Sequence, residues 1–139
     1  MATTQRKPNP PTVGFAEQAA AFTTFRALEQ GVPAAWARSL EQQGLTRDDI
    51  RRIIPDRTLD RRTAKGEMLK IIEADGLVRL LRVVKAARDL FQNDTNADVF
   101  LRSPNPALGE RIPIHMAQTD IGAREVETII GRLSHGVYS

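Results

Sequence analysis

The sequence contains no cysteine and only two histidines, one tryptophan and one tyrosine. Without cysteine the chain has neither a disulfide nor a thiolate ligand for a metal. His115 and His135 stand alone in unrelated segments, which does not indicate a histidine-based zinc site. We therefore expect no metal and no cofactor. The lack of disulfides fits a cytoplasmic protein.

Long apolar runs and enzyme motifs are also missing. No run of about 18 apolar residues is present, so we expect no membrane-spanning helix. Residues 1–14 lack the apolar region of a secretory signal and predict a disordered or extended arm. Neither GxSxG nor GxxxxGK[ST] occurs, and Glu125 and Glu127 lie two apart on a predicted helix, facing different sides. We expect no enzyme activity.

Signals for β-structure are missing too, because there is no Asn-Gly or Asp-Gly hairpin turn and no sustained apolar alternation. Apolar residues recur at helical spacing instead, and we predict an all-α fold. In the first helix Phe25 and Leu28 belong to the apolar stripe, and in the second Trp36 is either a core residue or an interface anchor. Helices are predicted over residues 15–30, 32–43, 46–54, 57–65, 73–91, 95–101 and 119–136.

Two of these helices are short and follow each other closely. The first starts at Thr46, which forms a capping-box-like pair with Asp49. Pro55 ends that helix, and Asp56 is predicted to cap the second, which covers residues 57–65. Two short helices separated by a tight break have the outline of a helix-turn-helix.

The same region carries the surplus of positive charge. Residues 47–70 hold eight lysines and arginines against five aspartates and glutamates, a surplus equal to the +3 net charge of the chain. Arginine can bond to guanine in the major groove, and lysine and threonine can bond to phosphates. An ordinary solvated helix face would have a similar composition, and both interpretations stay open. The candidate DNA-binding residues are Arg57, Thr58, Arg61, Arg62 and Lys65.

The longest predicted helix, from about residue 73 to 91, has a wide apolar face. Gly76 is a weak point that is predicted to mark its true start. The face fits either a core connector or a surface for dimerisation or for contact with a partner protein. After it, Thr95 or Asn96 is predicted to cap a short helix that reaches Leu101. The apolar face comprises Leu77, Leu80, Leu81, Val83, Val84, Ala87, Leu90 and Phe91.

The C-terminal segment carries the most specific pattern in the chain: PN-x-ALG, then T-x-x-GA-x-EVE, then GR-x-x-x-GVYS. It resembles the antitoxins with the Xre/MbcA/ParS toxin-binding domain, in particular the Xre partners of RES-domain toxins. Phe100-Leu101 stands where Trp-Leu is expected, and Glu110 stands where a second glycine is usual. The matching residues are Pro104, Asn105, Ala107, Leu108, Gly109, Thr119, Gly122, Ala123, Glu125, Val126, Glu127, Gly131, Arg132, Gly136, Val137, Tyr138 and Ser139.

The resemblance implies a type II antitoxin that covers the active-site entrance of a RES-domain toxin, an enzyme that consumes NAD or transfers its ADP-ribose. It also implies repression of the antitoxin's own operon through operator DNA, and a homodimer. The expected division is an arm over residues 1–14, an Xre-like helix-turn-helix region over 15–72, and the connecting helix with the toxin-binding domain over 73–139. The alternative is a stand-alone helix-turn-helix repressor whose C-terminal module only dimerises it.

For toxin contact, the closing helix and tail combine an arginine, an aromatic ring and a terminal carboxylate. Arginine and tyrosine are frequent interface anchors. Our hypothesis is that Arg132 or the terminal carboxylate occupies or blocks a pocket built for the phosphates of NAD. Alternatively, Val137 and Tyr138 fold back to complete the core. The candidate toxin-binding residues are Arg132, His135, Val137, Tyr138 and Ser139.

Overall fold

The computed structural model describes residues 25–136, and within these the chain forms α-helices and short 3-10 helices but no strand. The predicted all-α fold is confirmed. Within the described residues no helix is both long and apolar enough to span a membrane. The elements are α2 (Phe25–Gln30), α3 (Ala34–Ser39), η1 (Leu40–Gln43), α4 (Arg47–Ile53), α5 (Asp56–Ala64), α6 (Ile71–Phe91), α7 (Asp94–Arg102), η2 (Pro106–Leu108), α8 (Pro113–Met116) and α9 (Asp120–Ser134).

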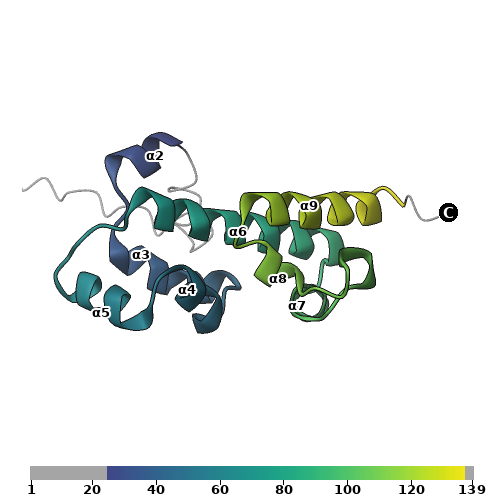
Figure 1. The fold of residues 1–139 in the computed structure, drawn as a ribbon, viewed down its shortest axis with the longest axis horizontal. Helices are drawn as coiled ribbons and strands as arrows, with labels where there is room; N and C mark the ends of the chain where they lie inside the picture. Colours follow the sequence, from purple (N-terminus) through teal and green to yellow (C-terminus); the bar gives the residue numbers. More distant parts are fainter. Residues whose placement is uncertain (1–24, 137–139) are drawn as a thin grey trace, which may run out of the picture.

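Helix α6 is the axis of the molecule. Figure 1 shows α2, α3, α4 and α5 around its first half, and α7, α8 and α9 around its second half. Among these, α2 and α4 contact the first half of α6 directly, and α7, α8 and α9 contact its second half. A single 21-residue helix therefore supplies core surface to both ends of the chain.

The start of α4 matches the prediction. Thr46 accepts a hydrogen bond from the backbone N–H of Asp49 (3.1 Å), and the Asp49 carboxylate accepts one from the N–H of Thr46 (2.7 Å). The start of α5 does not match, because Pro55 occupies the N-cap position and Asp56 is the first helical residue. The Asp56 carboxylate is therefore free to bind arginine side chains instead of the helix backbone.

The predicted start of α6 at Gly76 is wrong. The helix begins at Ile71, where the Glu73 carboxylate accepts a hydrogen bond from the N–H of Lys70 (2.8 Å). Gly76 is buried inside the helix because Ile53 of α4 packs across it, and a Cβ at that position would lie 3.2 Å from the Ile53 side chain. The glycine permits close packing of two helices and does not mark a helix end.

The wide apolar face of α6 is covered by the chain itself. Its central residues Leu77, Leu80, Val83, Val84 and Ala87 are at most 1% exposed. The core-connector interpretation is therefore confirmed for this face, and Trp36 of α3, at 6% exposed, is likewise a core residue. Leu81, Leu90 and Phe91 of this face are half-buried, and its centre offers no free surface for a second copy or for a toxin.

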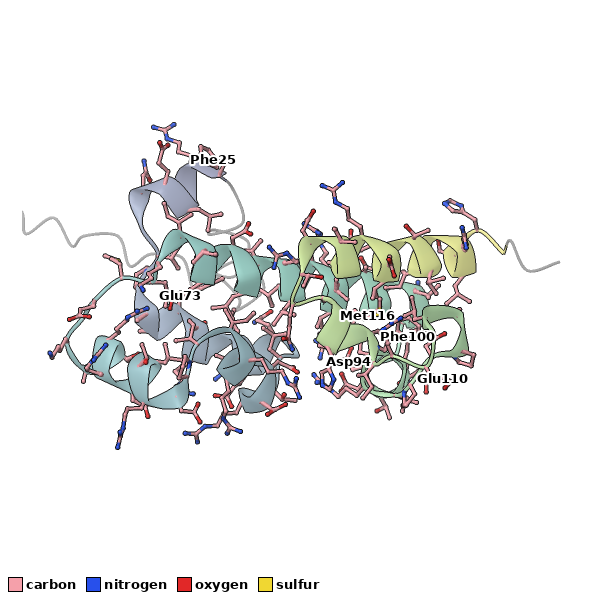
Figure 2. The ribbon with its side chains drawn as sticks, in the orientation of Figure 1. Phe25, Glu73, Asp94, Phe100, Glu110 and Met116 are labelled. Carbon is pink, nitrogen blue, oxygen red and sulfur yellow. The ribbon has the colours of Figure 1, made fainter. Side chains whose placement is uncertain are left out.

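Exposed apolar side chains lie at and just before the N-terminal end of α6. Met68, Ile71 and Ile72 are 54%, 60% and 77% exposed. Phe25 is 77% exposed, which contradicts its predicted place on the inner face of the first helix. Helix α2 is held through Leu28, whereas Phe25 lies at its outer end and points away from α6 (Figure 2). The remainder of the predicted first helix and the predicted N-terminal arm lie outside the described residues.

The loop before α8 explains one departure from the expected family pattern. Gly109 has a φ of 65°, and Glu110 follows with a φ of 63°, so two successive residues are left-handed. Only glycine adopts that conformation without strain, which is the physical reason for a usual second glycine. The N–H of Glu110 bonds to the carbonyl of Asn105 (2.9 Å) and keeps the turn closed.

The other departure, Phe100, serves as a core aromatic residue. Its ring packs against Phe91 with centroids 5.4 Å apart, and Leu101 beside it is fully buried. The predicted cap of this short helix is off by a few residues, because Asn93 caps α7 by accepting a hydrogen bond from the N–H of Asn96 (2.9 Å). Thr119 caps α9 as predicted, accepting from the N–H of Gly122.

Candidate binding surfaces

The first candidate surface is the exposed side of α5. Arg57, Arg61 and Lys65 recur every four residues, which places them on one face of the helix, and all three are exposed. The salt bridges of the described chain include none to these three residues. Thr58 beside them is half-buried. The structure therefore leaves three unpaired cations in a row along α5.

Arg62 does not belong to this face. Its side chain is buried and forms an ion pair with Glu73 of α6, whose carboxylate also caps the start of that helix. Figure 2 shows Glu73 on the side of α6 that faces the N-terminal helices. The prediction that Arg62 contacts DNA is corrected accordingly: this arginine joins α5 to α6. Burying an arginine requires such a partner, and the partner lies 11 residues further along the chain.

Several neighbouring arginines are neutralised by Asp56. Its carboxylate accepts a hydrogen bond from Arg51 (2.9 Å) and lies 3.4 Å and 3.5 Å from the guanidinium groups of Arg47 and Arg38. The hydrogen bond from Arg51 is the main reason why the pKa of Asp56 lies below its ordinary value. Arg38 also bonds to Asp60. Arg38, Arg47 and Arg51 therefore have acidic partners, whereas Arg57 and Arg61 on α5 have none among the described residues.

An ion pair with a buried carboxylate joins α4 to the end of α7. Both oxygens of the Asp49 carboxylate accept hydrogen bonds from the guanidinium of Arg102, at 2.9 Å and 2.8 Å, and the Asp49 side chain is only 2% exposed. Arg102 also donates to the carbonyl of Gly44 (3.2 Å). The bonds to Asp49 raise the pKa of Arg102. No sequence pattern indicated this pair, because its partners are 53 residues apart.

The second candidate surface is the outer face of α9. Arg132 is exposed in the last turns of the helix, and His135 is exposed at its C-cap position. Val137, Tyr138 and Ser139, the other predicted toxin-binding residues, lie outside the described residues. The predicted end of the helix near Gly136 is confirmed, since that glycine has a φ of 64° directly after the helix.

An open groove lies on this outer face, between α9 and the short helix η2. The groove was not predicted from the sequence, because it exists only where η2 lies against α9. The spacing of the residues that α9 contributes is a partial signal, since they recur every three or four residues on the polar side of an amphipathic helix. The main residues that line the groove are Leu108, Ile121, Arg124, Glu125, Thr128 and Arg132.

Comparison with known proteins gives consistent matches. A family model described as the antitoxin Xre/MbcA/ParS C-terminal toxin-binding domain matches residues 86–136. Three similar proteins are each described as antitoxin Xre. The protein of Yersinia enterocolitica is 40% identical over 87 residues, a match that spans 62% of this chain and 59% of the relative. The protein of Photorhabdus laumondii is 30% identical over 92% of this chain and 88% of the relative, and that of Pseudomonas putida is 28% identical over 86% and 76%.

Proposed function

The chain belongs to the Xre antitoxin family, and we propose that it neutralises a RES-domain toxin by covering the entrance of the toxin's active site. The observation that carries this proposal is the exposed outer face of α9 with its groove and Arg132, which lies inside the segment matched by the toxin-binding family model. Arginine on an exposed helix is a frequent interface anchor.

The proposed contact continues from α9 into the tail. Arg132 and His135 are exposed at the C-terminal end of α9, and residues 137–139 come next in the sequence. A toxin that consumes NAD has a pocket for anionic phosphates, which is the target proposed for this segment. In this proposal Tyr138 and Ser139 enter the toxin while α9 covers the rim of the pocket.

Co-expression with the neighbouring gene tests the proposed function. We expect the neighbouring product alone to stop growth, and the two proteins together to restore it and to co-purify as a stable complex. Specific binding to the upstream promoter without any complex would instead favour the alternative, a repressor whose C-terminal module only dimerises it. In that case the proposal of toxin neutralisation is wrong.

We also propose that α4 and α5 form a DNA-binding helix-turn-helix, with α5 in the major groove. The support is the row of three unpaired cations on its exposed face. Reading two half-sites requires a dimer. The apolar face of α6 no longer argues for one, and the exposed Met68, Ile71 and Ile72 next to α5 are the surface that we assign to it. The proposed DNA contacts are Arg57, Thr58, Arg61 and Lys65.

Replacing Arg57 and Arg61 with alanine should weaken binding to the promoter fragment by about 100-fold, since each good arginine contact contributes about 1–3 kcal/mol. Fluorescence anisotropy at fixed salt measures this affinity. The matched control replaces Arg26 of α2 and Lys85 of α6 with alanine. Both are exposed, and their replacement removes the same amount of positive charge. An equal loss in both variants would mean that only net charge matters. Growth rescue should survive in both.

A further inference from the structure

The groove between α9 and η2 has a volume of about 360 Å³ and combines an apolar base with an exposed apolar rim. Leu108 and Ile129, which line it, are only 5% and 8% exposed and belong to the core. Ile121, at the start of α9, is 74% exposed. The exposed Ile121 side chain makes little apolar contact with its own chain. An exposed apolar side chain beside an apolar groove is typical of an interaction site.

Two charged side chains that line the groove have no ion-pair partner among the described residues. Arg124 bonds to Asp120 one turn earlier on the same helix (2.9 Å). The ion pairs of residues 25–136 include none to Arg132 or Glu125. Arg132 is therefore free to bind a carboxylate from outside, and Glu125 is free to bind a cation.

Ile121 and Arg132 are 11 residues apart on α9, which corresponds to about 16 Å along the helix. Both line the groove and lie inside the segment matched by the toxin-binding family model. A single partner segment of this length can therefore contact both residues.

We propose that this groove receives a short segment of the toxin itself, which carries an apolar side chain and a nearby carboxylate. The apolar side chain packs between Ile121 and Leu108, and the carboxylate pairs with Arg132. This inference rests on the proposed function and deepens it: the face of α9 that is proposed to cover the toxin also holds one of the toxin's own segments. The groove then sets how long the complex lasts.

The test is the substitution of Ile121 by glutamate. Ile121 is the second residue of α9, where a carboxylate is favoured by the helix dipole, so the variant should fold normally. The dissociation constant for the purified toxin encoded by the neighbouring gene should rise at least tenfold in calorimetry. The matched control is Val99→Glu on α7, which is 61% exposed and outside the groove, and it should leave the affinity within twofold.

The sign of the charge at Arg132 tests the carboxylate. Arg132→Gln removes the positive charge, whereas Arg132→Glu places a negative charge beside the proposed carboxylate. Arg132→Glu should therefore bind the toxin several-fold more weakly than Arg132→Gln. Equal losses in the two variants would overturn the assignment of an acidic segment.

Two further outcomes separate the groove from the function. If the unaltered chain binds the toxin and Ile121→Glu binds it equally well, the groove proposal is wrong and the antitoxin role stands. If the unaltered chain does not bind the toxin at all, the proposed function itself fails. A change of sedimentation coefficient in Ile121→Glu with unchanged toxin affinity would make the groove a contact between copies of this chain, which also overturns the proposal.

Discussion

Replacing Gly122 with alanine should destabilise the protein by about 3 kcal/mol, although alanine is the better helix former. A Cβ on Gly122 would lie 2.7 Å from the carbonyl carbon of Met116 and closer still to its oxygen. Met116 lies directly beneath α9 (Figure 2), and these are backbone atoms that cannot rotate away. Helices α8 and α9 would have to separate, which would disturb the Thr119 cap as well. Urea unfolding measures the loss.

Gly131 provides the matched control on the same helix. A Cβ at Gly131 would meet no atom within 4 Å. Alanine there should stabilise the protein by about 0.5–1 kcal/mol, because it restricts the unfolded chain and favours the helix. The two substitutions are chemically identical and should have opposite signs. Destabilisation of similar size at both positions would show that close approach to Met116 is not the cause.

Replacing Arg102 with alanine should cost about 3 kcal/mol, since removing one partner of a buried ion pair leaves the other charge without compensation. In the intact protein the Asp49 side chain is 2% exposed, and without Arg102 only the N–H of Thr46 would bind its carboxylate. We expect a lower urea midpoint with an unchanged slope. We also expect weaker promoter binding, because the start of α4 loses its attachment to α7.

The control for Arg102 is an arginine in an exposed pair. Arg52 bonds to Asp48 one turn away on α4, and the two side chains are 41% and 56% exposed. Arg52→Ala should therefore change stability by less than about 0.5 kcal/mol. A comparable loss in both variants would mean that the Asp49–Arg102 pair contributes no more than a surface salt bridge.

Local features of the fold followed from the sequence because their causes are local. The capping pair Thr46–Asp49 and the cap at Thr119 involve residues three apart, and the apolar spacing of α6 and α9 defined their buried faces. The errors at Asp56 and Gly76 have non-local causes. Three arginines bind Asp56 from outside its helix, and Ile53 of another helix packs closely against the glycine.

The candidate sites were less predictable for the same reason. Spacing placed Arg57 and Arg61 on one face of α5, but it could not show that Arg62 reaches Glu73 in the next helix. The groove depends on η2 lying against α9, which no periodicity reports. The family resemblance located the toxin-binding segment. The residues that form its surface could be identified only from the arrangement of the helices.

The shared helix α6 has a consequence for protein turnover. The segment matched by the toxin-binding family model begins at residue 86, inside α6, and the preceding turns of this helix pack against α2 and α4. Neither end of the molecule can therefore be cut away while the other keeps its core. With the proposed function, a cell that degrades this antitoxin releases the toxin and the promoter in one event. The rate at which α6 unfolds or is cleaved therefore determines when both are released.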